Sequence, residues 1–280
     1  QMCIRDSNNR DKIILATKVA GRSGMKWFRG GETRLDKKNI ELAIEGSLKR
    51  LQTDYVDLYQ LHWPDRPLNI FGGGLGAYKH YDLESIEISE TLDVLSEIVK
   101  TGKVRHIALS NETPWGLSEF INKSETKNLP RVQSVQNAYN LLNRTYEYGM
   151  SEFAHRSSVG LLAYSPLAQG YLSGKYLNGA MPKGSRTQLF GRGQRYETPA
   201  AENSIKAYVD YAKKIGMDPS VMANAFVNSR EFVTSNIIGA TTMDQLKLAV
   251  GSWEVKLSEE DFKEFDACLL YTSPSPRDDR

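Results

Sequence analysis

Short apolar runs alternate with longer amphipathic segments along most of this chain. Six runs have the length of strands: 11–19, 55–62, 104–109, 132–136, 159–164 and 234–238. Apolar residues recur at the helical period near 36–51, 86–101, 113–122, 146–157, 202–216, 219–229, 242–250 and 258–266. In the first of these, Ile40, Ala43, Ile44 and Leu48 share one face, which predicts an amphipathic helix.

This alternation predicts an α/β fold with parallel strands, because parallel neighbours need a long crossover, usually a helix. A closed (β/α)8 barrel and an open doubly wound sheet both fit it. No G-x-G-x-x-G follows any predicted strand, which weakens the open dinucleotide-binding sheet. We therefore expect a (β/α)8 TIM barrel of which the last six βα units are present. At about 30 residues per unit, the two others would add about 60 residues before residue 8.

The two ends of the chain do not share this pattern. Residues 1–7 follow neither period, and residues 268–280 contain two Ser-Pro steps and no core pattern. We interpret both as non-native flanks that resemble translated adapter scars, and 8–267 as the barrel domain. A natural disordered tail is the alternative interpretation.

Composition narrows the classes of partner. The chain of 280 residues is 40% hydrophobic and 25% charged, as in globular proteins. Its net charge of +2 gives no electrostatic case for a nucleic-acid or membrane-surface partner, and no apolar run approaches the roughly 18 residues of a membrane span. Both cysteines, Cys3 and Cys268, lie in the flanks. The body therefore has no disulfide framework and no thiolate chemistry, and we expect a cytoplasmic protein.

Polar residues gather where the predicted strands end. They are Lys18, His62, Ser110-Asn111, Gln136-Asn137, Tyr164-Ser165 and Gly239-Ala240-Thr241-Thr242. Barrel active sites lie at the C-terminal strand ends, so these residues form the candidate site. Each also has a structural interpretation: Lys18 could extend to solvent, His62 could be a satisfied core histidine, and Ser110-Asn111 could cap the next helix. The joint pattern, with hydrogen-bonding groups at all six ends, favours a binding site.

Several motifs in chain order carry a family resemblance. They are Ala16–Val19, Tyr55–Pro64, Gly102–Arg105, Ser110–Thr113, Gln136-Asn137, Leu141–Arg144, Leu162–Leu167, Gly174–Ala180 and Gly239–Leu246. Over about residues 10–266 the chain resembles the aldo-keto reductases, and most closely the Tas-like members of that family. The resemblance implies a (β/α)8 barrel that binds NADPH, needs no metal, and reduces aldehydes and ketones.

The resemblance also implies catalytic roles. The family's catalytic set is Asp, Tyr, Lys and His. Lys18 matches the lysine, whose charge lowers the tyrosine pKa, and His62 matches the histidine that orients the carbonyl oxygen. Hydride passes from the nicotinamide to the carbonyl carbon, and the tyrosine protonates the alkoxide. The family's tyrosine and aspartate would lie before residue 1, since Tyr55 and Tyr59 stand within the His62 strand. We therefore expect a fragment that lacks the proton donor and has slight activity at most.

The cofactor residues that the resemblance implies follow the dinucleotide from one end to the other. They are Ser110, Asn111 and Gln136 for the carboxamide, Tyr164 for the nicotinamide ring, Ser165, Leu167 and Gln169 for the pyrophosphate path, Lys175 and Arg186 for phosphate charge, and Gly239, Ala240, Thr241, Thr242 and Gln245 for the adenosine phosphate. Solvated loop charge is the alternative for Lys175 and Arg186. Selection of NADPH over NADH is an expectation from the family alone.

Three functions stay open at this point. The first is an NADPH-dependent carbonyl reductase with a small carbonyl substrate. The second is a non-catalytic nucleotide-binding barrel that acts as a regulatory or interaction subunit. The third is a Schiff-base aldolase that uses Lys18 as its nucleophile.

Overall fold

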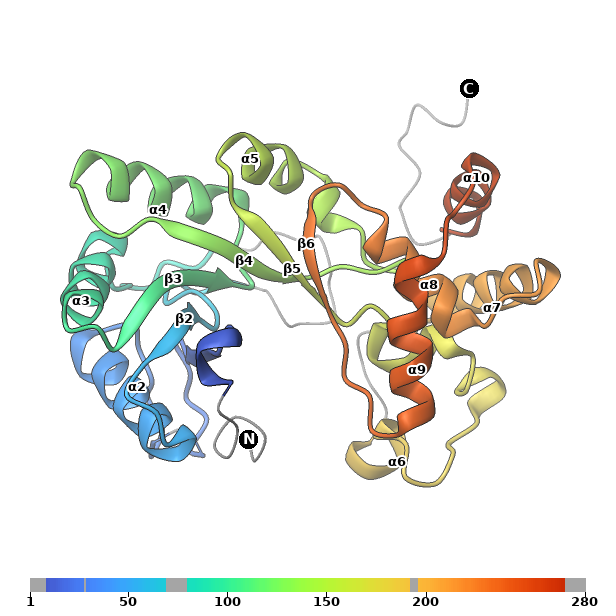
Figure 1. Cartoon of the computed structure of the whole chain (residues 1–280), viewed down its shortest axis with the longest axis horizontal. Coiled ribbons are helices and arrows are strands. Elements are labelled where there is room, and N and C mark those ends of the chain that lie inside the picture. Colours follow the sequence, from blue (N-terminus) through green and yellow to red (C-terminus); the bar gives the residue numbers. More distant parts are fainter. Residues whose placement is uncertain (1–8, 28, 69–79, 192–195, 270–280) are drawn as a thin grey trace. The chain divides into compact units, whose positions relative to one another are not determined.

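The computed structural model describes residues 9–27, 29–68, 80–191 and 196–269 (Figure 1). The flank expected at 1–7 and all but two residues of the one expected at 268–280 lie outside these ranges. The chain divides into two compact units. The first runs up to Asn137 and includes Gly149–Leu161, and the second comprises Ala138–Tyr148 and the chain from Leu162 onward. No helix in the described ranges has both the length and the apolar character that a membrane crossing requires.

The first unit alternates strands and helices. Its elements are η1 (Arg10–Lys12), β1 (Ala16–Val19), α2 (Lys37–Leu51), β2 (Val56–Leu61), α3 (Ile88–Lys100), β3 (Val104–Ser110), α4 (Pro114–Thr126), β4 (Val132–Ala138) and α5 (Met150–Arg156). Strands β1 to β4 pair in parallel, with Lys18 opposite Gln60 and Ser110 opposite Gln136. Helices α2, α3 and α4 lie along the outer side of these strands (Figure 1).

The second unit is richer in helices. Its elements are η2 (Thr145–Glu147), the end of β5 (Gly160–Tyr164), η3 (Ala168–Ser173), η4 (Leu177–Gly179), α6 (Arg186–Phe190), α7 (Pro199–Lys214), α8 (Pro219–Asn228), β6 (Val233–Ile237), α9 (Met243–Gly251), η6 (Ser252–Glu254) and α10 (Glu259–Cys268). Tyr208, Phe226 and Phe265 are fully buried. The Tyr208 hydroxyl contacts the carbonyl oxygens of Leu141 and Phe265 at 3.1 and 3.0 Å, which fixes α7 against α10.

The six predicted strands are all present, in the order β1-β2-β3-β4-β5-β6, and they alternate with helices. The sequence therefore predicted the α/β class correctly. An eight-stranded barrel is a finer expectation than these six strands test.

Two predicted boundaries are wrong for identifiable reasons. The strand predicted from residue 11 begins only at Ala16, because Arg10–Lys12 forms a 3-10 turn. Arg10 donates to Asp57 at 2.8 Å, and the amide of Leu15 donates to the same carboxylate at 2.9 Å. The helix predicted at 146–157 is interrupted at Gly149, whose φ of +76° a residue with a side chain rarely adopts.

Large apolar side chains are exposed at several places, of which two lie on helix α9 and just before strand β1. In α9 no residue is buried, and Met243 and Val250 are 64% and 61% exposed. Just before β1, Ile14 is 81% exposed. Because helices and strand ends of globular proteins normally bury their apolar positions, both surfaces are available for further packing.

Candidate active site

Lys18 and His62 lie at the ends of adjacent strands in the first unit. The His62 amide donates to Val19 at 2.8 Å, next to Lys18. Burial lowers the pKa of Lys18. Burial and, second, the charge of Lys18 lower the pKa of His62 to about 4. At neutral pH the imidazole is therefore uncharged and can donate one hydrogen bond and accept another.

This arrangement predicts how His62 titrates. By NMR, His62 should have a pKa of about 4. Lys18→Met should raise that pKa only part of the way toward the usual value of about 6.5, because burial is the larger cause. Lys12→Met, on the exposed η1 turn, serves as the control. A wild-type His62 that titrates at its usual pKa would contradict this description of the site.

The loop after β3 joins the ends of β2 and β4. Ser110 Oγ and the Asn111 amide both donate to the carbonyl of Gln136, at 2.8 and 3.0 Å. The Asn111 side chain donates to the carbonyl of His62 at 2.8 Å, and the residue has a left-handed φ of +52°. The structure therefore brings together four of the residues singled out in the sequence: His62, Ser110, Asn111 and Gln136.

The sequence placed Asn137 among the polar strand-end residues without an individual function, and the structure shows that it holds this loop in place. Its side chain accepts from the Glu112 amide at 3.0 Å and donates to the Glu112 carbonyl at 2.8 Å. The reciprocal pair fixes the backbone that carries Ser110 and Asn111. The sequence feature that could have indicated this function is the position of Asn137 directly after Gln136.

Asp65 is a second residue that the sequence analysis missed. Its carboxylate is buried and accepts from Arg34 at 2.8 Å and from the amides of Leu35 and Ile86 at 3.1 and 2.9 Å. Burial alone would raise the pKa of Asp65, but the bonds from Arg34 and the two amides outweigh it and leave the pKa below its usual value. Asp65 thus ties the loop after β1 to the segment just before α3.

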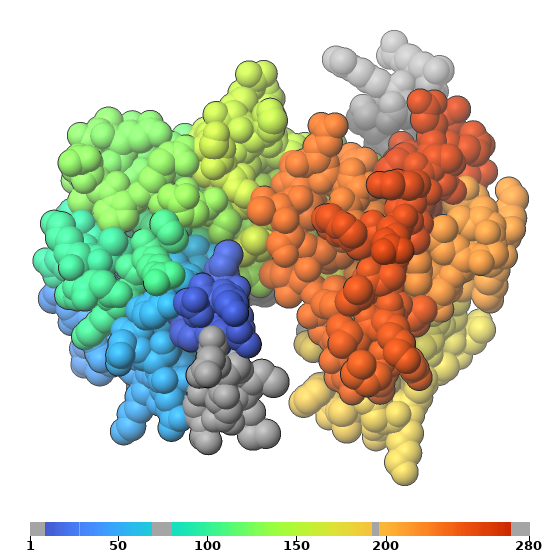
Figure 2. All heavy atoms as spheres, in the orientation of Figure 1, coloured from blue at the N-terminus to red at the C-terminus, as the bar shows by residue number. Residues whose placement is uncertain are grey.

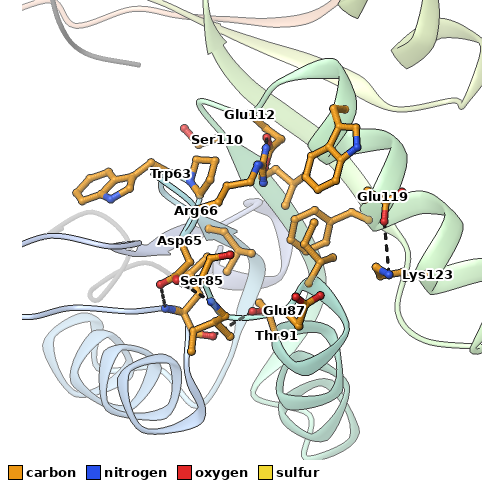
Figure 3. Close-up of a pocket in the computed structure, with 18 residues that line it drawn as sticks. Trp63, Asp65, Arg66, Ser85, Glu87, Thr91, Ser110, Glu112, Glu119 and Lys123 are labelled. Carbon is orange, nitrogen blue, oxygen red and sulfur yellow. Dashed lines mark hydrogen bonds and ion pairs between the residues drawn. The ribbon is translucent and has the colours of Figure 1, made fainter. Parts of the chain in front are cut away.

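A cavity of about 240 Å³ opens beside these strand ends, between the β2–α3 loop, the start of α3 and α4 (Figure 3). Arg66 forms an ion pair with Glu112 and lies 4.9 Å from the ring centre of Trp115. Glu119 and Lys123 form an ion pair at 3.4 Å on α4. Arg66 and Lys123, the two cations that line the cavity, are therefore each paired with a carboxylate.

In the second unit, the backbone after Tyr164 turns left-handed repeatedly. Ser165, Ala168, Gln169 and Gly170 have φ values of +60°, +47°, +60° and +97°. Non-glycine residues adopt this region rarely and at a cost, and such strain collects at functional sites. The amides of Ala168 and Gly170 donate to the carbonyls of Ser165 and Leu167, at 2.8 Å each, and hold this turn closed. The Gln169 side-chain oxygen Oε1 is also buried without a hydrogen-bond partner.

The other candidate residues of this unit lie on loops and helix starts. Leu167 precedes η3, Lys175 Nζ lies 5.1 Å from the ring centre of Tyr176, and the exposed Arg186 begins α6. Gly239, Ala240, Thr241, Thr242 and Gln245 are all exposed. Thr242 caps α9, and Gln245 Oε1 accepts from the Thr241 amide at 2.9 Å. Among the residues that the structure describes, no three His, Cys, Asp or Glu side chains are grouped to hold a metal ion.

Comparison with known proteins agrees with the motifs. The aldo/keto reductase family model matches residues 1–270. Protein tas of Escherichia coli K12 is 46% identical over 271 residues, which are 96% of this chain and 78% of that protein. An aldo-keto reductase of Babesia bovis is 39% identical over 84% of this chain and 87% of its own length. L-glyceraldehyde 3-phosphate reductase of E. coli K12 is 30% identical over 85% and 64%. The chain belongs to the aldo/keto reductase family.

Proposed function

We propose that this chain is an NADPH-dependent reductase of aldehydes and ketones, with Lys18 and His62 as its catalytic residues. The observation that carries the proposal is an uncharged imidazole beside a half-buried lysine at adjacent strand ends. His62 donates a hydrogen bond to the substrate oxygen. The positive charge of Lys18 stabilises the negative charge that develops on that oxygen. NADPH, when bound, supplies the hydride.

The described residues fit such a cofactor. In the first unit, Ser110, Asn111 and Gln136 offer hydroxyl and amide groups for the carboxamide. In the second unit, Lys175 and Arg186 supply positive charge that suits a pyrophosphate, and we assign them to a pyrophosphate-binding loop together with Ser165, Leu167 and Gln169. We assign Tyr164 to the nicotinamide ring and Gly239, Ala240, Thr241, Thr242 and Gln245 to the adenosine phosphate.

The two tyrosines nearest to His62 in the sequence of its strand, Tyr55 and Tyr59, are both engaged in packing contacts. The Tyr59 hydroxyl donates to Ile40 of α2 at 2.8 Å, and the guanidinium groups of Arg10 and Arg105 lie over the Tyr55 ring at 4.0 and 4.2 Å. Both tyrosines are therefore packing residues. We propose that two further βα units supply the tyrosine and the aspartate. Six strands where the barrel needs eight, and the uncovered α9, support this.

Cofactor binding and turnover test the proposal directly. NADPH should quench the tryptophan fluorescence of the chain when it binds. The chain should also oxidise NADPH slowly in the presence of a reactive aldehyde. Gln136→Ala should weaken binding by about tenfold, the value of one lost hydrogen bond. Gln133→Ala, at an exposed position of the same strand, is the matched control. Absence of NADPH binding would overturn the cofactor assignment. Turnover equal to that of E. coli Protein tas would overturn the proposal that two further βα units supply the proton donor.

One observation favours a second candidate, a Schiff-base aldolase. Lys18 has no hydrogen-bond or ion-pair partner in the described part of the chain, and burial lowers its pKa, as suits an amine nucleophile. Borohydride trapping of a carbonyl substrate on Lys18 would support it, and NADPH-dependent turnover would count against it. A regulatory nucleotide-binding role would be favoured by NADPH binding that never leads to turnover, even with the two further units attached.

A further inference from the structure

Arg66 joins two loops that follow different strands of the first unit. It stands four residues after His62, between β2 and α3, and its guanidinium group contacts Glu112, between β3 and α4 (Figure 3). Nη1 donates to Glu112 Oε2 at 3.3 Å, and Nη2 donates to Glu112 Oε1. Nη2 also donates to Thr113 Oγ1 at 3.1 Å. One side chain of the first loop therefore holds three acceptor atoms of the second.

This ion pair is largely withdrawn from water. The side chain of Glu112 is 2% exposed and that of Arg66 is 17% exposed. The Glu112 carboxylate also accepts from the amide of Thr113 at 2.6 Å, and the Trp115 ring lies over the guanidinium group. When one partner of a buried pair is removed, the other is left as an uncompensated charge. The conformation of Glu112 therefore depends on Arg66.

The main chain of Glu112 leads to the candidate cofactor residues. Ser110 and Asn111 directly precede it in the sequence. The Glu112 amide donates to the side chain of Asn137 at 3.0 Å, and its carbonyl accepts from that side chain at 2.8 Å. Arg66 holds the side chain of residue 112, and Asn137 holds its main chain. A change at either contact is expected to reach the two residues before it.

Asn111 needs such support because its backbone is strained. Its φ of +52° is left-handed, a conformation that residues with a side chain keep only where the surrounding structure imposes it. Its amide donates to the carbonyl of Gln136 at 3.0 Å, and its side chain donates to the carbonyl of His62 at 2.8 Å. Both bonds require this conformation, so a loop released at residue 112 would lose them together.

Gly116, in the first turn of α4, leaves the space in which the pair lies. A Cβ atom at this position would overlap both Arg66 Nη2 and Glu112 Oε1. Any other residue would therefore displace the guanidinium group or the carboxylate. Glycine is less favourable than alanine in a helix. The helix thus has a poorer residue at the one position of its first turn where the ion pair needs room.

We propose that Arg66 is a positioning residue that, through Glu112, holds Ser110 and Asn111 in the geometry that receives the carboxamide of the nicotinamide. The loop after β2 thereby sets the conformation of the loop after β3. The use of that geometry for a cofactor rests on the proposed function. The effect of Arg66 on the loop needs neither cofactor nor turnover.

Hydrogen exchange of the Asn111 amide, measured by NMR in the 280-residue chain, tests the effect on the loop. Arg66→Met should speed this exchange by about tenfold or more, the value of a hydrogen bond to a charged group. Lys123→Met is the matched control, because it breaks the ion pair with Glu119 in the same cavity and should leave the exchange unchanged. Equal exchange in wild type and Arg66→Met would overturn the proposal.

Gly116→Ala distinguishes positioning from general support of the fold. It keeps both charged residues and favours the helix, yet it displaces the ion pair. It should speed exchange of the Asn111 amide, as Arg66→Met does, and leave exchange of the Leu48 amide in α2 unchanged. Faster exchange at both amides would show a general loss of stability and overturn a positioning role.

NADPH binding then connects the loop to the cofactor. Arg66→Met and Gly116→Ala should both weaken NADPH binding, because a loop that is open part of the time offers Ser110 and Asn111 to the cofactor in fewer molecules. Faster exchange with unchanged NADPH affinity would overturn the positioning of the carboxamide and leave the proposed function intact. A wild-type chain that binds no NADPH would overturn the proposed function, while the exchange rates would still decide whether Arg66 holds the loop.

Discussion

Attaching the first two βα units of E. coli Protein tas to this chain is expected to raise kcat/KM for a reactive aldehyde by about 10²- to 10⁴-fold, the usual contribution of a general acid. The reason is that Tyr55 and Tyr59 are both committed to packing, and we propose that the tyrosine of the further units is the proton donor for the site around Lys18 and His62. NADPH oxidation measures the effect.

Two variants of the fused protein show whether the gain is chemical. Replacing the tyrosine of the added segment by phenylalanine should remove most of it and leave the fold intact. Lys18→Met should lower the rate as well, because the lysine charge no longer favours proton transfer. If the fused protein is folded, binds NADPH and reacts no faster than the chain alone, the assignment of the donor to the further units is wrong.

Asp65→Ala is expected to lower the free energy of unfolding by about 3 kcal/mol, as for removal of one partner from a buried ion pair. The variant leaves Arg34 without its counter-charge and two amides, of Leu35 and Ile86, without an acceptor. Urea denaturation measures the loss as a lower midpoint. Asp210→Ala, which breaks an exposed pair with Lys206 on α7, is the control and should change the midpoint little.

The same carboxylate gives the stability a dependence on pH. The pKa of Asp65 is lower in the folded state than in the unfolded one, so its contribution is complete above the unfolded value of about 3.9. It is lost as the pH falls through the lower, folded-state pKa. Asp65→Asn should flatten the stability curve in this acid range, and an unchanged curve would show that other carboxylates dominate it.

The sequence predicted the elements well because most of them are specified locally. In α2, for instance, Asp36 caps the helix and Ile40, Ile44 and Leu48 repeat at its period. Contacts between distant residues carry no such signal. The start of β1 depends on a bond from Arg10 to Asp57, 47 residues away, and the break before α5 depends on the left-handed φ of Gly149.

The residues of the candidate site also fall into those that local sequence predicts and those that depend on contacts between distant residues. Lys18, His62, Ser110 and Gln136 could be found because the ends of parallel strands meet at one edge. The environments of Asp65 and Gln60 could not, since they depend on which groups these residues meet. Asp65 accepts from donors of two loops, whereas the buried donor Gln60 Nε2 meets no acceptor in the described part of the chain. Strand pairing and burial are needed to tell one from the other.

The division of the chain into two units has a consequence for synthesis. The first unit is completed by Gly149–Leu161, yet Ala138–Tyr148, which come earlier in the chain, belong to the second. On the ribosome, the first unit therefore stays unfinished until Leu161 has emerged, by which time part of the second is already outside the exit tunnel. No single proteolytic cut or gene split yields either unit intact.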